Sequence, residues 1–370
     1  MIIYMILLVA SAGFALSYMD SDSVRTQIEP IRRLLGFFFI LALIGLYIWR
    51  GNTVGTDYPM YNMFLAQPST YLEGVGVESG YVWLYGIAAA KQWPLFVTTV
   101  SSLMTLVGLY LFALRVKVAT PMFASMDVLT YVYLSSFNLV RQMAAMGICF
   151  TGLALFTPED EKTPFQWHFW WRYVIYVILV VIAMRFHSSV VIALVLPFCM
   201  YIKVKPWMAW TGLVLTTVGF VFELGNRLVP ILSRFFPHYL AKYSGDMSAF
   251  LETGTKGLIA FIPVLIQFLI IIAIIHYDPD FVESHQWLTA LYLIFLTWFV
   301  MAGNQAAIRA QDCWLPAGIY FFGRYLQVGQ APIGRLSPNF MKLFIVMFFF
   351  LYTVLRIVTN NSGIYPYIFR

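Results

Sequence analysis

The sequence predicts an all-α, polytopic integral membrane protein, and three observations carry this prediction. Of the 370 residues, 61% are hydrophobic and only 11% are charged, whereas soluble domains carry about 25% charged residues. The apolar residues form long uninterrupted runs, unlike the alternating segments of outer-membrane barrels. The 23 Lys and Arg residues lie mostly singly between these runs, as topology signals do. This composition argues against a soluble enzyme, a secreted disulfide scaffold or a nucleic-acid-binding module.

Apolar runs bounded by charge, proline or polar clusters predict about twelve membrane helices, within a range of about 11–13, because several runs are shorter than the roughly 17–25 residues of a spanning helix. The first run lacks a basic n-region and is read as an uncleaved helix with its N-terminus outside. We treat residues 1–370 as a single transmembrane domain. The expected helices cover residues 1–18, 33–49, 94–114, 122–137, 142–156, 173–185, 188–202, 207–225, 257–277, 288–302, 312–326 and 341–358.

Residues 226–256 are expected to form an outer amphipathic loop. In its first part, apolar residues recur at helical spacing opposite a basic stripe that includes Arg227 and Arg234. This pattern is typical of a helix lying in the membrane interface. A plain connecting loop is the alternative.

Counting the spans from an outer N-terminus places the polar clusters on the outer face and Arg115, Lys117 and Arg324 in the cytoplasm. The acidic loop 278–285 opposes this orientation. The first cluster lies in an outer-face polar segment, residues 50–93. It contains Arg50, Asp57, Tyr61 and Glu78. Thr56 or Asp57 can cap a short helix whose first turn holds Tyr58 and Pro59. Asp57 stands among aromatic residues and is a candidate base; the alternative is a capped loop.

Two further clusters interrupt apolar sequence. Asn138, Arg141 and Gln142 share one helical face, and a guanidinium at a helix centre costs about 2.5–3.5 kcal/mol on insertion scales. An arginine extending to the interface is the alternative. The other cluster is Arg185, Phe186, His187 and Ser188.

A chain break is expected at residues 185–187. An unbroken helix over 173–202 would be about 45 Å long, which exceeds the bilayer core. At such a break, Arg185 and His187 can face one ligand. A lone histidine beside apolar residues is otherwise usually structural.

A fourth cluster supplies Arg309, which Asp312 could pair with structurally. Together, Arg50, Arg141, Arg185 and Arg309 form a set of guanidiniums on one side of the membrane, with few carboxylates expected nearby to neutralise them. Arginine forks match phosphate oxygens, so the expected ligand is a phosphate-bearing lipid, whose departing diphosphate these charges would stabilise. We expect no cofactor and no metal site, and the three cysteines show no metal or disulfide motif.

The same residues carry a family resemblance. The sequence resembles the EpsG-type branch of the Wzy polysaccharide polymerases, which make O-antigen, capsule and exopolysaccharide. The resemblance covers most of the chain, and its C-terminal third matches only through Arg309 ahead of Tyr320-Phe321. The motifs are Met1-Ile2-Ile3-Tyr4, Arg50, Gly55-Thr56-Asp57, Tyr61, Glu78 before Gly80-Tyr81, Asn138, Arg141-Gln142, Ala144 and Phe186-His187-Ser188.

The resemblance implies a fold related to GT-C-like glycosyltransferases that use lipid-phosphate sugars. It implies transfer of a growing glycan from undecaprenyl diphosphate to the non-reducing end of a lipid-linked repeat unit, outside the bacterial cytoplasmic (inner) membrane. The implied partners are the lipid-linked oligosaccharide, membrane lipid, a flippase and a chain-length regulator. The supporting or acceptor-sugar residues are Tyr61, Glu78, Asn138, Gln142 and Ser188.

Two other functions compete with this one. A transporter or flippase for lipid-linked oligosaccharide would show repeated halves, and no repeat is visible. A membrane-bound O-acyltransferase would use His187 but leaves the arginines unexplained. For glycosyl transfer we favour His187 over Asp57 as the base, since histidine titrates near neutral pH; Asp57 would then orient the acceptor sugar.

Overall fold

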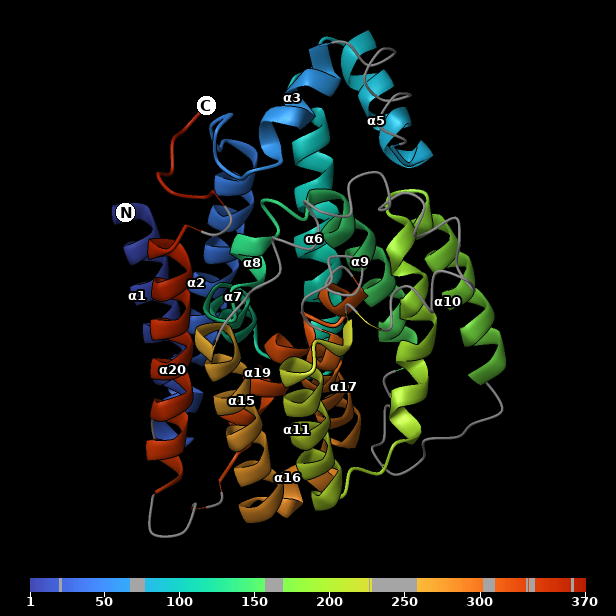
Figure 1. The fold of residues 1–370 in the computed structure, drawn as a ribbon. Helices are drawn as coiled ribbons and strands as arrows, with labels where there is room; N and C mark the ends of the chain where they lie inside the picture. Colours follow the sequence, from blue (N-terminus) through green and yellow to red (C-terminus); the bar gives the residue numbers. More distant parts are fainter. Residues whose placement is uncertain are drawn as a thin grey trace. The chain divides into compact units, whose positions relative to one another are not determined.

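The computed structural model is built from helices throughout the part of the chain that it describes (Figure 1). Within that part there is no β-strand, only an isolated antiparallel bridge between Arg50 and Phe369. The all-α prediction is therefore confirmed for these residues. The structure describes residues 1–19, 22–66, 77–156, 169–225, 227, 258–301, 310–330, 332, 337–360 and 363–370.

The described residues divide into two compact units by their internal packing. Each unit is all-helical, and the single transmembrane domain expected over residues 1–370 stays a prediction. Unit 1 comprises Met1–Pro197, Gly318–Val328 and Asn339–Arg370, and unit 2 comprises Phe198–Ala317 and Gly329–Pro338.

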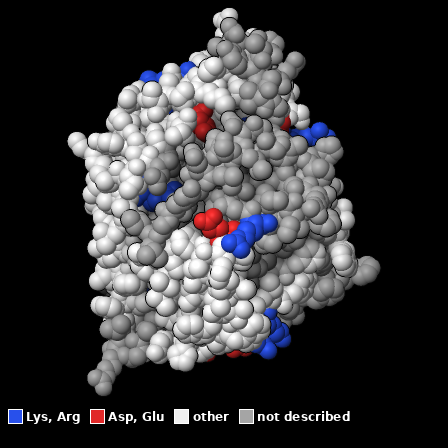
Figure 2. Space-filling model, viewed as in Figure 1, with Lys and Arg blue, Asp and Glu red and all other residues white. Residues whose placement is uncertain are grey.

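Four of the described helices are long and apolar enough to cross a membrane. They expose large apolar side chains such as Ile2, Phe38 and Leu351, as expected of helices whose solvent is lipid. Figure 2 shows one face of the molecule, on which charged side chains are sparse among the described residues. The prediction of a membrane protein is confirmed at this level, and the number of about twelve spans stays a prediction. The four are α1 (Ile2–Leu16) with η1 (Ser17–Met19), α2 (Asp22–Ile48), α6 (Phe96–Arg115) and α20 (Pro338–Val358).

Helix α7 (Thr120–Leu129) forms the centre of unit 1. All of its residues are buried, and α1, α2 and α6 pack against it. The Thr353 hydroxyl of α20 donates to the carbonyl of Leu129 at 2.7 Å. The span expected over residues 122–137 ends early, because Tyr131 adopts φ +68°, a left-handed conformation that no α-helix continues. A short helix, α8 (Val132–Ser135), follows.

The closest helix crossing joins α6 to α9 (Val140–Leu153), which leads into η2 (Ala154–Phe156). A Cβ atom at Gly147 would lie 1.9 Å from the carbonyl oxygen of Met104, and one at Gly108 would lie 2.2 Å from that of Gly147. Only glycine permits this approach of two backbones. The crossing fixes α9, whose first turn carries Arg141.

We expect Gly147→Leu to destabilise unit 1 by about 3 kcal/mol or more, because overpacking at this crossing must push the two helices apart. Thermal unfolding of the purified protein in detergent measures the effect. Gly13→Ala on α1 is the matched control, since nothing lies within 4 Å of a Cβ atom there. If Gly147→Leu unfolds at the same temperature as Gly13→Ala, the close crossing is contradicted.

Other helices depart from the expected spans. The residues expected to form a membrane helix over 188–202 form the 3₁₀ helix η3 (Ser188–Tyr201), which contains Pro197; proline has no N–H to donate to a helical ladder. Helices α3 (Tyr58–Ala66) and α5 (Ser79–Ala90) lie in the polar segment 50–93, outside the expected spans. The short helix expected to begin at Tyr58 is confirmed as α3. Helix α5 is shorter than a membrane span, so a search for spans does not find it.

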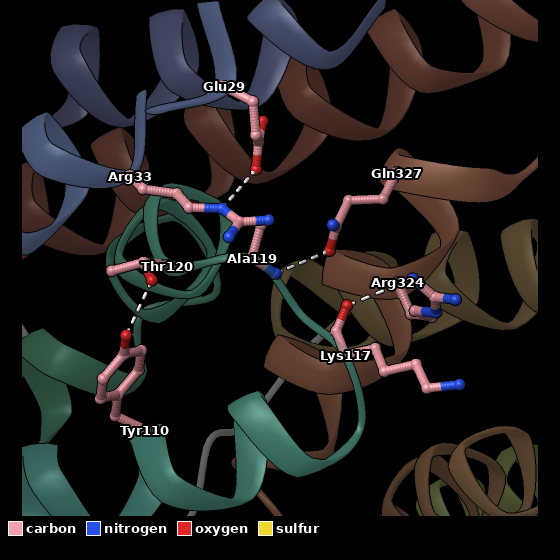
Figure 3. Close-up of polar contacts among 8 residues, drawn as sticks. All are labelled: Glu29, Arg33, Tyr110, Lys117, Ala119, Thr120, Arg324 and Gln327. Carbon is pink, nitrogen blue, oxygen red and sulfur yellow. Dashed lines mark hydrogen bonds and ion pairs between the residues drawn. The ribbon is translucent and has the colours of Figure 1, made fainter. Parts of the chain in front are cut away.

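One end of unit 1 is held together by polar contacts (Figure 3). Two of these contacts, made by Gln327 and Arg324, join the turn between α6 and α7 to α19 (Ala317–Val328). They place Lys117 and Arg324, both expected in the cytoplasm, side by side. The contacts are Tyr110 to Thr120 at 2.7 Å, the Ala119 amide to Gln327 at 3.1 Å, Arg324 to the Lys117 carbonyl at 3.2 Å, and Arg33 to Glu29 at 3.1 Å.

Unit 2 is a smaller group of helices around α11. Gly212 and Gly219 let α11 approach Thr297 and Val300, to whose side chains their Cβ atoms would lie 2.6 and 2.4 Å away. The Tyr292 hydroxyl donates to Gln267 at 2.7 Å. The helices are α11 (Pro206–Val221), α15 (Leu258–Tyr277), α16 (Pro279–Ser284), α17 (Gln286–Thr297) and η4 (Trp298–Met301).

Candidate functional site

Three of the predicted site residues meet in unit 1. Glu78 immediately precedes α5, Arg141 is the second residue of α9, and His187 lies between α10 (Phe169–Met184) and η3. The Arg141 Nη1 atom lies 2.5 Å from Glu78 Oε2, and the His187 Nδ1 atom lies 3.4 Å from Glu78 Oε1. One carboxylate therefore connects residues from three separate polar clusters of the sequence.

The chain break at residues 185–187 is confirmed, since α10 ends at Met184 and η3 begins at Ser188. Two backbone contacts fasten this break to the start of α5. The Gly80 amide donates to the Arg185 carbonyl at 2.7 Å, and the Ser188 amide donates to Glu78 Oε1 at 3.4 Å. A Cβ atom at residue 80 would lie 2.7 Å from the Arg185 oxygen. The close approach therefore requires glycine.

The site is largely shielded from solvent. The exposed fractions of the side chains are 8% for Glu78, 17% for Arg141 and 11% for His187. Burial alone would raise the pKa of Glu78, but the neighbouring His187 ring and the charge of Arg141 outweigh it and hold that pKa well below its usual range. Glu78 is therefore ionised at neutral pH.

The expectation that the arginines lack acidic partners is wrong for Arg141. Its partner, Glu78, stands 63 residues earlier in the sequence, and helix packing brings the two together. A buried ion pair offsets the cost of removing its charges from water only when its geometry is good and additional donors satisfy the carboxylate. Here the Ser188 amide supplies one of them.

Buried aromatic side chains pack beside the site. The Tyr81 ring meets the Phe186 ring edge-on at 5.8 Å, and its hydroxyl contacts Ser101 Oγ at 2.8 Å and the Val140 carbonyl at 3.4 Å. Tyr81 thus links α5, α6 and α9 beside the chain break. No role for Tyr81 is predicted from the sequence, although the pair Gly80-Tyr81 after Glu78 was the available signal. Tyr58, Tyr61, Phe64 and Tyr85 belong to the same buried cluster.

Arg50 lies in a different environment, a fully buried aromatic cage. Its guanidinium carbon is 4.2 Å from the ring centroid of Tyr47, 4.3 Å from that of Tyr58 and 4.8 Å from that of Phe137, distances at which cation–π attraction is strong. Arg50 itself is 0% exposed. Its predicted contact with diphosphate stays a prediction.

The C-terminal residues fasten the loop that follows Arg50. The Gly51 amide donates to the Ile368 carbonyl at 2.5 Å, and the Gly55 amide donates to the Gly363 carbonyl at 2.9 Å. Gly55 has φ +104°, which favours glycine. The loop brings Asp57 to the start of α3, where its carbonyl accepts from the Tyr61 amide at 3.3 Å.

The remaining predicted site residues fall into three groups. Asn138 lies beside Gly55, where a Cβ atom would be 2.8 Å from its Oδ1, and Tyr61 interacts with the Arg141 guanidinium. Gln142 is buried, Ser188 is half-buried, and the side chain of Arg185 is exposed. Arg309 lies outside the described residues, as does the amphipathic loop 226–256 apart from Arg227.

Acidic, histidine and cysteine side chains do not gather into a possible metal site anywhere in the described part of the chain. The three cysteines, Cys149, Cys199 and Cys313, are buried and unbridged.

Comparison with known proteins identifies the family. Neither the curated proteins nor the solved structures contain a match to this sequence. A family model described as the EpsG family matches residues 33–369, which include Arg50, Glu78, Arg141 and His187. The chain therefore belongs to the EpsG family.

Proposed function

We propose that this chain is a polysaccharide polymerase, a membrane glycosyltransferase that moves a growing glycan from undecaprenyl diphosphate onto the non-reducing end of a lipid-linked repeat unit. Membership of the EpsG family supports a polymerase of this type. The observation that carries the proposal is the convergence of Arg141 and His187 on Glu78. A cation for phosphate and a base for a hydroxyl are thereby held at one place.

The proposed step is a displacement at the anomeric carbon of the donor glycan. The acceptor hydroxyl oxygen forms the new bond to that carbon, and the bond from the carbon to the diphosphate oxygen breaks. The hydroxyl proton passes to His187, and the electron pair leaves with the lipid diphosphate. General-base catalysis of this kind contributes about 10²–10⁴-fold.

Arginine stabilises the departing diphosphate. Arg141 uses Nη1 for Glu78, and a guanidinium has five N–H donors, so further donors serve the phosphate. Arg185, whose side chain is exposed, stands at the chain break beside His187 and is the second arginine of the proposal. Bidentate arginine contacts with phosphate combine charge with fixed geometry. The proposal also includes diphosphate contacts for Arg50 and Arg309. The residues proposed to orient or support the acceptor sugar are Asp57, Tyr61, Asn138, Gln142 and Ser188.

The proposed site faces the exterior of the bacterial cytoplasmic membrane, where a flippase supplies repeat units and a chain-length regulator limits the product. The test of function is turnover of the purified protein in detergent or liposomes with a synthetic diphosphate-linked repeat unit. A ladder of glycans differing by one repeat is expected. Unchanged substrate with folded protein would contradict a polymerase, and movement of the intact lipid between leaflets would instead favour a flippase.

The orientation of the chain in the membrane can be tested separately. In a background without native cysteines, Asn52→Cys should react with an impermeant thiol reagent applied to intact spheroplasts, because the exposed turn at Asn52 is assigned to the outer face. Lys117→Cys, at the exposed turn after α6, should react only after permeabilisation. Mass spectrometry of the labelled protein measures both. Labelling of Lys117→Cys alone in intact spheroplasts would reverse the orientation.

A further inference from the structure

The carboxylate of Glu78 has an unusually complete set of partners. Oε2 faces Arg141 at 2.5 Å, and Oε1 faces both the Ser188 amide and His187 Nδ1 at 3.4 Å. Glu78 is also the N-cap residue of α5, so its backbone is fixed by the helix that follows. Contacts from α9 and η3 thus hold one side chain from both sides.

We propose that Glu78 is a positioning residue, which holds His187 in the tautomer with its proton on Nδ1 and thereby makes Nε2 the atom that takes the proton from the acceptor hydroxyl. This inference rests on the proposed function. Glu78 thereby orients the base, beyond the supporting or acceptor-sugar role predicted for it from the sequence.

The tautomer follows from the chemistry of the pair. An ionised carboxylate has no proton to donate, so the ring nitrogen that faces it carries the N–H. Nδ1 is the nitrogen at the ion-pair distance from Glu78. In neutral imidazole the other nitrogen, Nε2, is then the acceptor. A carboxylate in this position also stabilises the imidazolium that forms when the base takes its proton.

The neighbouring charges require such a carboxylate. His187 shares Glu78 with Arg141 and stands two residues after Arg185 in the sequence, so a guanidinium lies on the opposite side of the same carboxylate. Positive charge disfavours protonation of the imidazole. Glu78, at the start of α5, supplies the opposing negative charge. The site can therefore hold cations for the diphosphate and still protonate its base.

The primary test compares Glu78→Gln with Glu78→Asp in the purified full-length chain. For Glu78→Gln we expect kcat to fall about 10²–10⁴-fold while the affinity for the diphosphate-linked donor changes by no more than a few fold. The acidic limb of the pH–rate profile should move to lower pH, because the charge that favours the imidazolium is gone. Glu78→Asp should recover part of kcat and part of the wild-type profile.

Glu29→Gln is the matched control. It removes the carboxylate of a second, more exposed ion pair in unit 1, with Arg33 at 3.1 Å (Figure 3), and its turnover and pH profile should equal those of the wild type. A lower rate in Glu78→Gln with an unchanged pH profile would overturn the positioning role, since a merely structural residue has that effect. A wild-type rate in Glu78→Gln would overturn it as well.

A second measurement determines the tautomer of His187 in the protein with Glu78 unchanged. Nitrogen chemical shifts of the five histidines, labelled with ¹⁵N and recorded at alkaline pH, report each tautomer, and His187→Gln identifies the resonance of His187. The Nδ1–H form is expected, and the Nε2–H form would overturn the inference. This measurement does not depend on turnover. An absence of polymerase activity with the Nδ1–H form present would thus reject the proposed function and leave the tautomer established.

Discussion

Replacing His187 by glutamine should lower the polymerisation rate by about 10²–10⁴-fold, because glutamine cannot take the proton of the acceptor hydroxyl. Binding of the lipid-linked donor should persist, since the guanidiniums remain. Initial rates of ladder formation measure the first effect, and titration with a fluorescent donor analogue measures the second. His187→Ala should give the same loss.

Two controls make this prediction specific. His276→Gln, at an exposed position in the last turn of α15, should keep the wild-type rate within about twofold, as surface changes usually do. Asp57→Asn tests the other candidate base. If Asp57→Asn is inactive while His187→Gln retains substantial turnover, Asp57 is the base and His187 is not.

Replacing Arg141 by alanine should destabilise the protein by about 3–5 kcal/mol, because it leaves the buried charge of Glu78 without its cation. The pair holds the pKa of Glu78 below its ordinary value of 4.5. Its stabilisation is therefore complete above about pH 4.5 and is lost as the pH falls toward the depressed pKa. The difference between wild type and Arg141→Ala should accordingly be largest near neutral pH and shrink in acid.

Thermal unfolding in detergent at several pH values measures this difference. Arg33→Ala is the matched control, since Arg33 is 69% exposed in its pair with Glu29 and such pairs contribute no more than about 1 kcal/mol. Arg141→Lys separates stability from catalysis: it keeps the charge but not the planar fork, so we expect near-normal folding with most of the activity lost. Equal activity of Arg141→Lys and wild type would contradict the diphosphate role of Arg141.

The sequence predicts well those features that depend on neighbouring residues. Long apolar runs predict α1, α2, α6 and α20, and the excess length of residues 173–202 predicts the break that carries His187. Each depends on the thickness of a bilayer and on helical rise. The short helix α5 follows no such rule, because tertiary packing of its aromatic residues stabilises it.

Contacts between distant residues were beyond sequence reasoning. Nothing near Arg141 in the sequence identifies Glu78 as its partner. The position of Arg141 depends instead on the packing of α9 against α6 at Gly108 and Gly147. Arg50 illustrates the same limit. Its charge suggested a phosphate ligand, whereas the fold surrounds it with aromatic rings from α2, α3 and the turn that contains Phe137.

The stoichiometry of the released lipid tests the proposed polymerase most directly. Purified protein is incubated with a diphosphate-linked repeat unit of defined mass, and mass spectrometry follows glycan and lipid together. We predict one undecaprenyl diphosphate released for each repeat added, with products spaced by whole repeats and no release by His187→Gln. Growth by single sugars, or release of undecaprenyl monophosphate as the primary product, would contradict transfer of a glycan from lipid diphosphate at this site.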